Sequence, residues 1–125
     1  MRTEPLHGMR VLVVEDEYYM ADDLVRALET AGAKAVGPFG TVRQAQDAID
    51  RDGIEAAVLD LNLHGIRSDE LAKRLNEAKV PTLIVSGYSQ EALPPELRHL
   101  KRLEKPIDSR MIVSALADEI AQNAV

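Results

Sequence analysis

The sequence predicts a single α/β domain of three layers, in which helices cover both faces of a parallel sheet. The first supporting observation is that short aliphatic runs alternate along the chain with longer segments whose apolar residues recur at helical spacing. The second is that these runs are almost entirely apolar, as in strands that are buried on both faces. The third is the length, because 125 residues without a repeat, low-complexity segment or linker fit one domain.

The first strand and the first helix are predicted by adjacent segments. The run "VLVV" at residues 11–14 is β-branched and ends at Glu15, which indicates a buried strand. Residues 17–32 then predict a helix that ends with Gly32 as its C-terminal cap. The apolar face of this helix consists of Met20, Leu24, Val25, Leu28 and Ala31.

The next strand and helix are shorter. Residues 33–37, "AKAVG", predict a second strand that is expected to end where Pro38 and Gly40 follow. Thr41 is a suitable N-cap for a helix over residues 42–53.

The third predicted strand ends at an acidic residue. Residues 55–60, "EAAVLD", predict a strand that ends at Asp60. A loop around Gly65 is expected to lead into a helix over residues 68–78, which Ser68 can cap.

The last part of the chain completes the alternation. The run "TLIVS" at residues 82–86 predicts the fourth strand, and residues 93–100 predict a poorly formed helix or loop because they contain two prolines. Residues 101–106 hold a very short fifth strand. A final helix over residues 108–122 is capped by Asp108. Its expected apolar face is Met111, Ile112, Ala115, Leu116 and Ile120.

Composition and charge exclude several classes of protein. A formal net charge of −6 argues against a general nucleic-acid binder, which needs a basic surface. The chain has no cysteine, which excludes disulfides and fits a cytoplasmic location. It shows no signal-peptide pattern and no apolar window near the roughly 20 residues of a membrane span. We expect residues 1–8 to be a flexible arm and residues 9–123 to be the folded domain.

Polar side chains stand at the ends of four predicted strands. Glu15 and Asp16 follow the first strand, Asp60 ends the third, Ser86 ends the fourth, and Lys105 closes the fifth. Each residue alone is more often a helix cap, a turn residue or a solvated surface charge. The carboxyl ends of parallel strands meet at one edge of the sheet, however, where ligands bind. We therefore expect these side chains to converge in one polar pocket.

This combination of groups indicates phosphoryl chemistry. Three carboxylates repel one another unless a hard cation such as Mg²⁺ neutralises them. A carboxylate supported in this way can act as a nucleophile and form an aspartyl phosphate. A lysine and a hydroxyl can then bind the oxygens of the transferred group. Lys105 and Ser86 suit these two tasks.

Four motifs together resemble the receiver domain of two-component response regulators. They are "VLVVEDE", "AAVLDLNL", "LIVSGY" and "LEKP", in the order and spacing of that family, and the resemblance covers residues 8–123. It implies a flavodoxin-like (βα)₅ fold with strand order 2-1-3-4-5. It also implies that the chain is a signalling phosphoacceptor rather than an enzyme with turnover.

The resemblance assigns a role to each residue of the pocket. Asp60 would be the phosphoacceptor, Asp16 a direct Mg²⁺ ligand, and Glu15 a ligand through water. Asn62 would offer its main-chain carbonyl to the metal. Ser86, Gly87 and Lys105 would form the phosphate-binding and switch group.

The chain also departs from the common pattern of the family. Arg102 stands where receivers usually carry a Tyr or Phe whose rotation reports phosphorylation, and Leu63-His64-Gly65 replaces the more common Pro-Gly turn. The motif "VSGYS" contains Tyr88 and is similar to a Phe-Ala-Thr-Gly-Tyr-type motif of an alphaproteobacterial subgroup of stand-alone receivers. We hypothesise that Tyr88 or the segment 87–100, rather than an aromatic residue at position 102, carries the switch.

The expected partners follow from the resemblance. The phosphoryl donor would be a histidine kinase or a histidine phosphotransfer protein, and a downstream protein would read the switched surface. A homodimer through the face of residues 87–120 is a further possibility, as is an acidic partner for the basic residues Arg98, His99, Lys101, Arg102 and Lys105. No nucleic-acid or membrane partner is expected.

Several interpretations stay open at this point. The chain could be a single-domain regulator, a phosphate relay or sink without DNA-binding output, or a piece of a hybrid kinase or longer regulator. It could also be a degenerate receiver that binds partners without phosphorylation. A haloacid-dehalogenase-type phosphatase is disfavoured, because Asn62 stands where that family needs a second aspartate.

Overall fold

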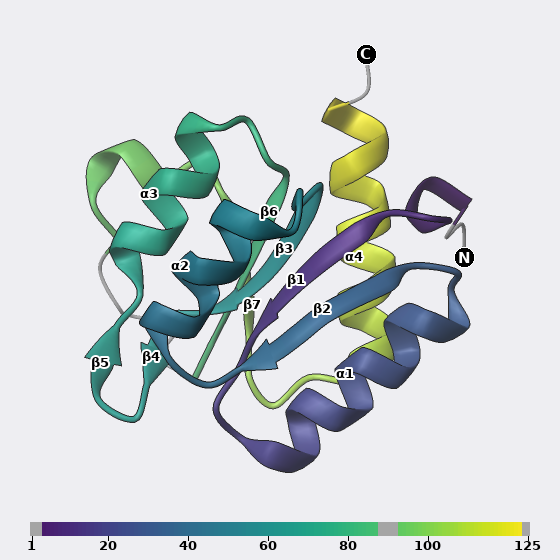
Figure 1. Cartoon of the computed structure of the whole chain (residues 1–125), viewed down its shortest axis with the longest axis horizontal. Coiled ribbons are helices and arrows are strands. Elements are labelled where there is room, and N and C mark those ends of the chain that lie inside the picture. The colour runs from purple at the N-terminus through teal and green to yellow at the C-terminus, as the bar shows by residue number, and fades with distance from the viewer. Residues whose placement is uncertain (1–3, 88–92, 124–125) are drawn as a thin grey trace.

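Five parallel strands form the central sheet of the structure, a computed structural model that describes residues 4–87 and 93–123 (Figure 1). Their order is β2-β1-β3-β6-β7. The strands are β1 (Arg10–Val14), β2 (Lys34–Phe39), β3 (Ala56–Asp60), β6 (Thr82–Ser86) and β7 (Lys101–Glu104). Numbered as the five strands of the sheet, this is the predicted order 2-1-3-4-5, so the doubly wound α/β fold is confirmed.

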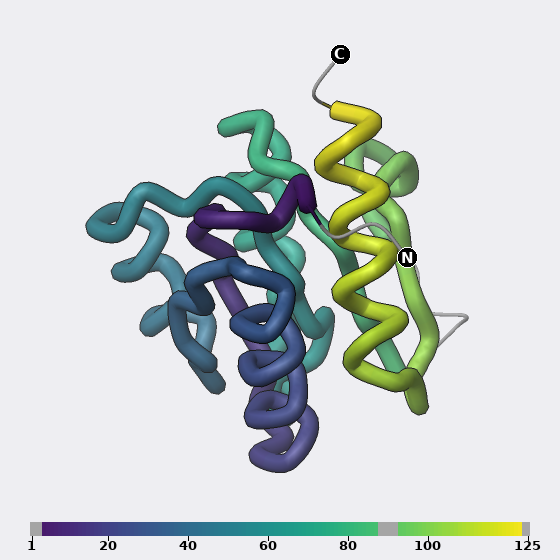
Figure 2. The backbone as a smooth tube through the Cα atoms, turned by 90° about the vertical axis from the view of Figure 1, so that its right-hand side faces the viewer, coloured from purple at the N-terminus to yellow at the C-terminus, as the bar shows by residue number. Residues whose placement is uncertain are grey.

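Helices cover both faces of this sheet, as Figures 1 and 2 show. They are α1 (Tyr18–Thr30), α2 (Val42–Arg51), α3 (Asp69–Glu77) and α4 (Ser109–Asn123). Alternate residues of β1 point to opposite faces, so that Val11 and Val13 join the core under α1 and α4, whereas Leu12 and Val14 join the core under α2 and α3. The two cores hold the sheet rigid, and its carboxyl edge can therefore position side chains.

Residues 4–8 pack against the domain, which differs from the flexible arm expected for residues 1–8, and residues 1–3 lie outside the described residues. A short 3₁₀-helix, η1 (Glu4–Leu6), lies beside α4, and Leu6 is fully buried in the core under α1 and α4. The main-chain amide of Gly8 also donates to the carbonyl of Gly32 at 2.8 Å. The buried Leu6 and the hydrogen bond of Gly8 thus both join this segment to the domain.

Strand β2 continues through Pro38 to Phe39, two residues beyond the predicted end. Proline removes one hydrogen-bond donor, but β2 is the outermost strand on its side of the sheet, where a proline is tolerated. The preceding Gly37 has a φ of 113°, and a Cβ at this position would lie 2.7 Å from the Val13 carbonyl oxygen. The strand therefore extends because glycine permits the close approach to β1.

The predicted loop around Gly65 is a two-stranded hairpin. Strand β4 (Asn62–Leu63) pairs antiparallel with β5 (Ile66–Arg67), and residues 64 and 65 form the turn between them. Both turn residues have positive φ, which is the geometry that two-residue hairpin turns favour. The histidine in this turn hid the hairpin from sequence analysis, because such turns are usually recognised from Asn-Gly or Asp-Gly.

Of the three residues predicted to cap helix N-termini, two do so and one does not. The Thr41 hydroxyl accepts from the Gln44 amide at 3.2 Å, and the Asp108 carboxylate accepts from the Arg110 amide at 2.8 Å, so both act as predicted caps. Ser68 precedes α3 but makes no side-chain cap bond. Its hydroxyl donates instead to the main-chain carbonyl of Asp60.

In the C-terminal part of the chain, one residue was wrongly assigned to the buried face of a helix. The prolines of the predicted poor helix lead into a single 3₁₀ turn, η2 (Pro95–Leu97), whose Leu97 is fully buried. On α4, Met111 is 61% exposed and does not belong to the buried face, which Val113 and Ala117 complete instead. None of the helices in the described ranges is long and apolar enough to cross a bilayer.

Candidate functional site

Three acidic side chains meet at the carboxyl edge of the sheet, as predicted. Glu15 and Asp16 directly follow β1, and Asp60 is the last residue of β3, the strand beside β1. Each offers one carboxylate oxygen to a group in which all three oxygens lie within 4.8 Å of one another. Glu15 and Asp60 are each only 5% exposed. The parallel pairing of two strands therefore builds a partly buried acidic cluster.

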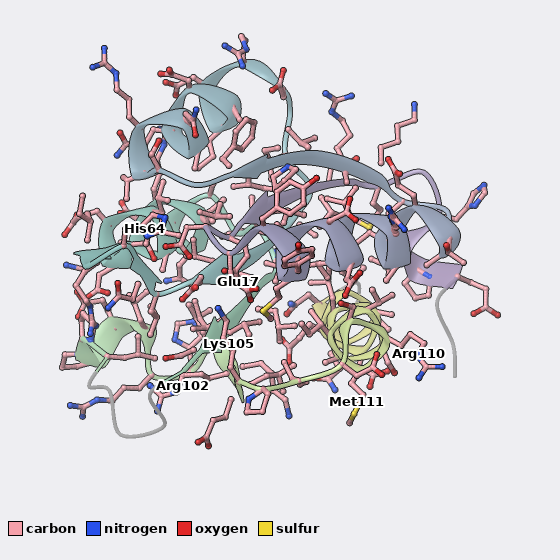
Figure 3. The ribbon with its side chains drawn as sticks, turned by 90° about the horizontal axis from the view of Figure 1, so that it is seen from below. Glu17, His64, Arg102, Lys105, Arg110 and Met111 are labelled. Carbon is pink, nitrogen blue, oxygen red and sulfur yellow. The ribbon has the colours of Figure 1, made fainter. Side chains whose placement is uncertain are left out.

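Lys105 lies between two of these acids. It directly follows β7, and its Nζ is 2.8 Å from Asp60 Oδ2 and 2.9 Å from Glu15 Oε1. Figure 3 views this edge of the sheet and labels Lys105 together with Glu17 and His64, which border the same site. One ammonium group thus neutralises part of the negative charge that two strand ends bring together.

The pKa values of this pair reflect burial and hydrogen bonding. Burial raises the pKa of Glu15, and this effect outweighs the hydrogen bonds from Lys105 and from the Glu17 amide, which lower it. Burial also acts to lower the pKa of Lys105, but hydrogen bonds to Asp60 and Glu15 outweigh that effect and raise it. Lys105 therefore stays protonated at neutral pH, whereas the ionised form of Glu15 is disfavoured by the fold. Further positive charge in the site would relieve that cost.

Two further hydrogen bonds hold Asp60, one to its carboxylate and one to its main-chain carbonyl. The Asn62 amide donates to Asp60 Oδ1 at 3.0 Å, so both carboxylate oxygens have donors. The hydroxyl of the fully buried Ser68 donates to the main-chain carbonyl of Asp60 at 2.5 Å. Sequence analysis missed this role of Ser68, because a serine before a helix is ordinarily read as its cap.

Asp16 is held by the β4–β5 hairpin rather than by Lys105. The His64 amide donates to Asp16 Oδ2 at 2.6 Å, and the ring Nδ1 of His64 lies 3.3 Å from the same oxygen. Within the hairpin, the Gly65 amide donates to the side-chain oxygen of Asn62 at 2.7 Å. The turn that was predicted as a loop therefore forms one wall of the site.

The predicted phosphate-binding and switch residues occupy neighbouring strand ends. Ser86 ends β6 and is 1% exposed, and its main-chain carbonyl accepts from the Lys105 amide at 2.8 Å. Gly87 is exposed and borders the same hollow as Asp60. Arg102 lies within β7 opposite Ile84, before the end of the strand. Tyr88 lies outside the described residues.

The acidic cluster opens into a hollow of about 600 Å³. Its described lining consists of Asp16, Glu17, Asp60, Asn62, His64, Gly65, Gly87 and Lys105. The donor set fits Mg²⁺, which prefers oxygen ligands, is held by one or two carboxylates and keeps several waters that need such space. The oxygen-only set of Glu15, Asp16 and Asp60 includes no thiolate or imidazole that would favour zinc.

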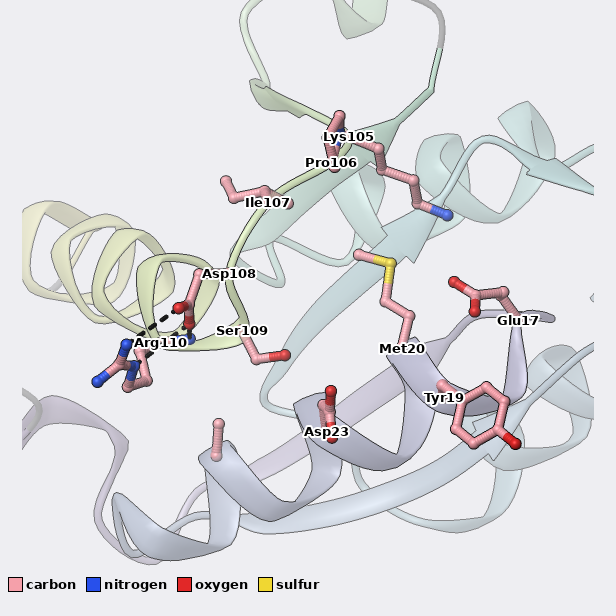
Figure 4. Close-up of a pocket in the computed structure, with 11 residues that line it drawn as sticks. Glu17, Tyr19, Met20, Asp23, Lys105, Pro106, Ile107, Asp108, Ser109 and Arg110 are labelled. Carbon is pink, nitrogen blue, oxygen red and sulfur yellow. Dashed lines mark hydrogen bonds and ion pairs between the residues drawn. The ribbon is translucent and has the colours of Figure 1, made fainter.

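A second hollow of about 790 Å³ adjoins the first (Figure 4). It lies between α1 and the segment 105–110, with Tyr19 and Met20 on one side and Ile107 on the other. Lys105 lines both hollows. A molecule that occupied the larger hollow would therefore lie beside the acidic cluster.

The predicted basic surface is not one continuous cluster. His99 precedes β7 and lines a separate hollow with Thr82 at the start of β6, whereas Lys105 follows β7 at the other end of the sheet. The His99 ring is engaged with the side chain of Asn76 at 2.9 Å. The basic residues that precede β7 are therefore separated from Lys105, which follows it, by the length of the strand.

Comparison with known proteins gives a consistent assignment. A model of the response regulator receiver domain matches residues 11–117. Sensory transduction protein LytT of Bacillus subtilis is 32% identical over 112 residues, 86% of this chain and 46% of the relative. Transcriptional regulatory protein TcrA of Mycobacterium tuberculosis is 40% identical over 93 residues, 74% of this chain and 36% of the relative. The chain spans less than half the length of both relatives.

A solved structure agrees over the whole length. The solution structure of SdrG from Sphingomonas melonis Fr1 is similar with a TM-score of 0.75 and 29% sequence identity, and the match covers 100% of each chain. The likeness therefore extends over the whole domain rather than over one part of it.

Proposed function

The chain belongs to the response regulator receiver family, and we propose that it accepts a phosphoryl group on Asp60. The donor is the phosphohistidine of a histidine kinase or a histidine phosphotransfer protein, and Mg²⁺ is required. The observation that best supports this proposal is the buried Asp60 carboxylate, 2.8 Å from Lys105 Nζ and grouped with two other acids. The chain then acts as a signalling phosphoacceptor, with only autophosphorylation from donors and autodephosphorylation as chemistry of its own.

The transfer step uses groups that are already oriented. A carboxylate oxygen of Asp60 forms a bond to phosphorus while the P–N bond of the donor breaks, and the donor nitrogen keeps the electron pair. The Asn62 amide and Lys105 hold the two carboxylate oxygens of Asp60, at 3.0 and 2.8 Å. Lys105 and the Ser86 hydroxyl then bind oxygens of the transferred group, and Gly87 borders the space that this group occupies.

The acidic residues have a separate task. Glu15, Asp16 and Asp60, together with the main-chain carbonyl of Asn62, would hold Mg²⁺. The bound ion supplies positive charge that offsets the charge of the phosphoryl oxygens during transfer. The raised pKa of Glu15 supports this assignment, because an ionised carboxylate in this enclosed position gains from a cation.

Phosphorylation is proposed to bias a surface that a partner protein reads. Movement of Ser86 and Lys105 toward the phosphoryl group would alter the segment 87–100 that follows β6. Arg102 in place of an aromatic residue favours an atypical switch in which Tyr88 takes part. The motif around Tyr88 supports placement in the alphaproteobacterial subgroup with the Phe-Ala-Thr-Gly-Tyr-type motif.

The wider setting is proposed on the same basis. Residues 9–123, together with the packed segment around Leu6, are proposed as the receiver unit, which acts in the cytoplasm as a signalling switch or as a phosphate relay or sink. Its output passes through a downstream protein, and a homodimer through the face of residues 87–120 is one route for it. No contact with nucleic acid or membrane is part of this proposal.

The decisive experiment is incubation with acetyl phosphate and Mg²⁺ followed by intact-mass measurement. We expect the wild type to gain the mass of one phosphoryl group and Asp60→Asn to gain none. Asp118→Asn, an exposed acid on α4, is the matched control and should be phosphorylated like the wild type.

Two outcomes would contradict the proposal. Modification of Asp60→Asn to the same extent as the wild type would place the phosphoryl group elsewhere. Absence of any modification of the wild type, with the small donor and with a phosphorylated phosphotransfer protein, would instead favour a degenerate receiver that binds partners without phosphorylation.

A further inference from the structure

The turn residue His64 adopts a backbone conformation that is uncommon for a residue with a side chain. Its φ is 51°, and with Gly65 at 86° it forms the two-residue turn between β4 and β5. Asparagine and aspartate satisfy such a turn at lower cost and are the residues most often found there. Histidine is also enriched at positive φ, so what sets His64 apart from asparagine or aspartate is its ring.

The conformation of His64 directs two of its groups at one oxygen atom. The main-chain amide lies 2.6 Å from Asp16 Oδ2, and the ring Nδ1 lies 3.3 Å from the same atom. The His64 side chain is 80% exposed, whereas the Asp16 side chain is 13% exposed. The ring is thus the exposed side of this contact, and the Asp16 carboxylate is its largely buried side.

The three acids of the cluster divide between two partners. Lys105 pairs with Glu15 and with Asp60. Among the ranges 4–87 and 93–123, Asp16 has an ion-pair contact with His64 alone. His64 is therefore placed beside Asp16 as Lys105 is placed beside the other two acids, although the imidazole forms an ion pair only in its protonated form.

We propose that His64 is a positioning residue for metal binding, which holds the Asp16 carboxylate with both its ring and its main-chain amide. This inference rests on the proposed role of Asp16 as a Mg²⁺ ligand. A carboxylate that already has a fixed orientation loses less conformational freedom when it binds a cation, so the free energy of binding is more favourable. The ring is the part of this arrangement that the turn itself does not require.

The test is calorimetric titration of the apo protein with Mg²⁺ at one fixed pH. His64→Asn and His64→Gly both suit the positive φ and keep the main-chain amide, but both lack the ring. We expect each variant to bind Mg²⁺ about tenfold more weakly than the wild type, the lower end of the effect of removing a partner of a metal ligand. The melting temperature without Mg²⁺ should not change.

Kinetics provides a second readout. The Mg²⁺ concentration that gives half the maximal rate of phosphorylation by acetyl phosphate should rise about tenfold in both variants, in line with the weaker affinity. The rate at saturating Mg²⁺ should remain that of the wild type. His99→Asn removes an exposed imidazole at the opposite end of β7 and is the matched control, with no expected change in either quantity.

Three results would overturn the role of His64. An unchanged or tighter dissociation constant in both variants would show that the ring does not help to hold Asp16. Weaker binding with an equally lowered melting temperature of both apo variants would indicate a purely structural role. A wild type that binds no Mg²⁺ would remove both this inference and the proposed metal site, whereas the first two results leave phosphorylation of Asp60 intact.

Discussion

At the scale of single residues, the predictable part of the site is the set of polar side chains at strand ends. Glu15, Asp16, Asp60 and Lys105 converge because parallel strands bring their carboxyl ends to one edge, and the sequence alone shows where these strands end. Ser68 could not be assigned in this way. A hydroxyl next to a helix can bind the helix amides or a distant carbonyl, and only the folded position of Ser68 beside the end of β3 decides in favour of Asp60.

The raised pKa of Glu15 leads to a pH-dependent prediction. Because the folded-state pKa lies above the ordinary value of 4.5, the stabilising contribution of protonated Glu15 is complete below pH 4.5 and is lost as the pH rises through the folded-state pKa. We therefore expect the free energy of unfolding of the wild type, relative to Glu15→Gln, to fall as the pH increases above 4.5. Urea unfolding of both proteins in Mg²⁺-free buffer at several pH values measures this difference.

Glu29→Gln is a suitable comparison, because Glu29 is exposed near the end of α1. Its stability relative to the wild type should vary much less over the same pH range. A constant difference between the wild type and Glu15→Gln would contradict the effect of burial on Glu15.

At the scale of elements, strands and helices with strong patterns were predictable and irregular ones were not. The buried runs of β1, β3 and β6 lie within two residues of their predicted positions. The hairpin β4–β5 was missed because its turn contains a histidine, and the end of β2 was misplaced because a proline is allowed in an edge strand. Met111 was misassigned because it lies outside the buried face of α4, which consists of Ile112, Val113, Leu116, Ala117 and Ile120.

The contrast between Leu6 and Met111 is testable. Leu6 is fully buried although it lies in a short N-terminal segment, whereas Met111 is 61% exposed although it lies in a long helix. We expect Leu6→Ala to lower the free energy of unfolding by about 2–4 kcal/mol, the usual cost of a buried Leu→Ala change. Met111→Ala should change it by less than about 0.5 kcal/mol, as for most surface positions.

Chemical denaturation of the two variants beside the wild type provides the measurement. A Leu6→Ala variant as stable as the wild type would mean that the N-terminal segment contributes nothing to the core. A Met111→Ala variant destabilised to the same degree as Leu6→Ala would mean that the exposed face of α4 is packed in solution.

At the scale of the whole molecule, the sheet order brings four segments of the chain to one site. The ends of β1, β3, β6 and β7 lie side by side because consecutive strands cross over on both faces of the sheet (Figure 1). The order of the strands was available from the sequence only through the family resemblance. The path of residues 62–67 depended on contacts between distant segments, which no local pattern records.

The crowded acids predict that Mg²⁺ stabilises the native protein. A cation that binds only the folded state adds RT ln(1 + [L]/Kd) to the free energy of unfolding, about 2.7 kcal/mol at roughly 100 times Kd. We expect the melting temperature to rise with Mg²⁺ concentration in the wild type and to rise much less in Asp16→Asn. Thermal melts at constant ionic strength separate this effect from general screening.

Asp118→Asn should respond to Mg²⁺ like the wild type, since this exposed acid on α4 takes no part in the cluster. An equal response of Asp16→Asn and the wild type would mean that the ion stabilises the fold from another place.

The contact between Glu15 and Lys105 joins residues that are 90 positions apart in the sequence. During synthesis, all of the residues from 15 to 105 must therefore leave the ribosome before this contact can form. A nascent chain that ends before Lys105 has no ammonium group beside Glu15 and Asp60, so its acidic residues lack the cation that pairs with them in the folded domain.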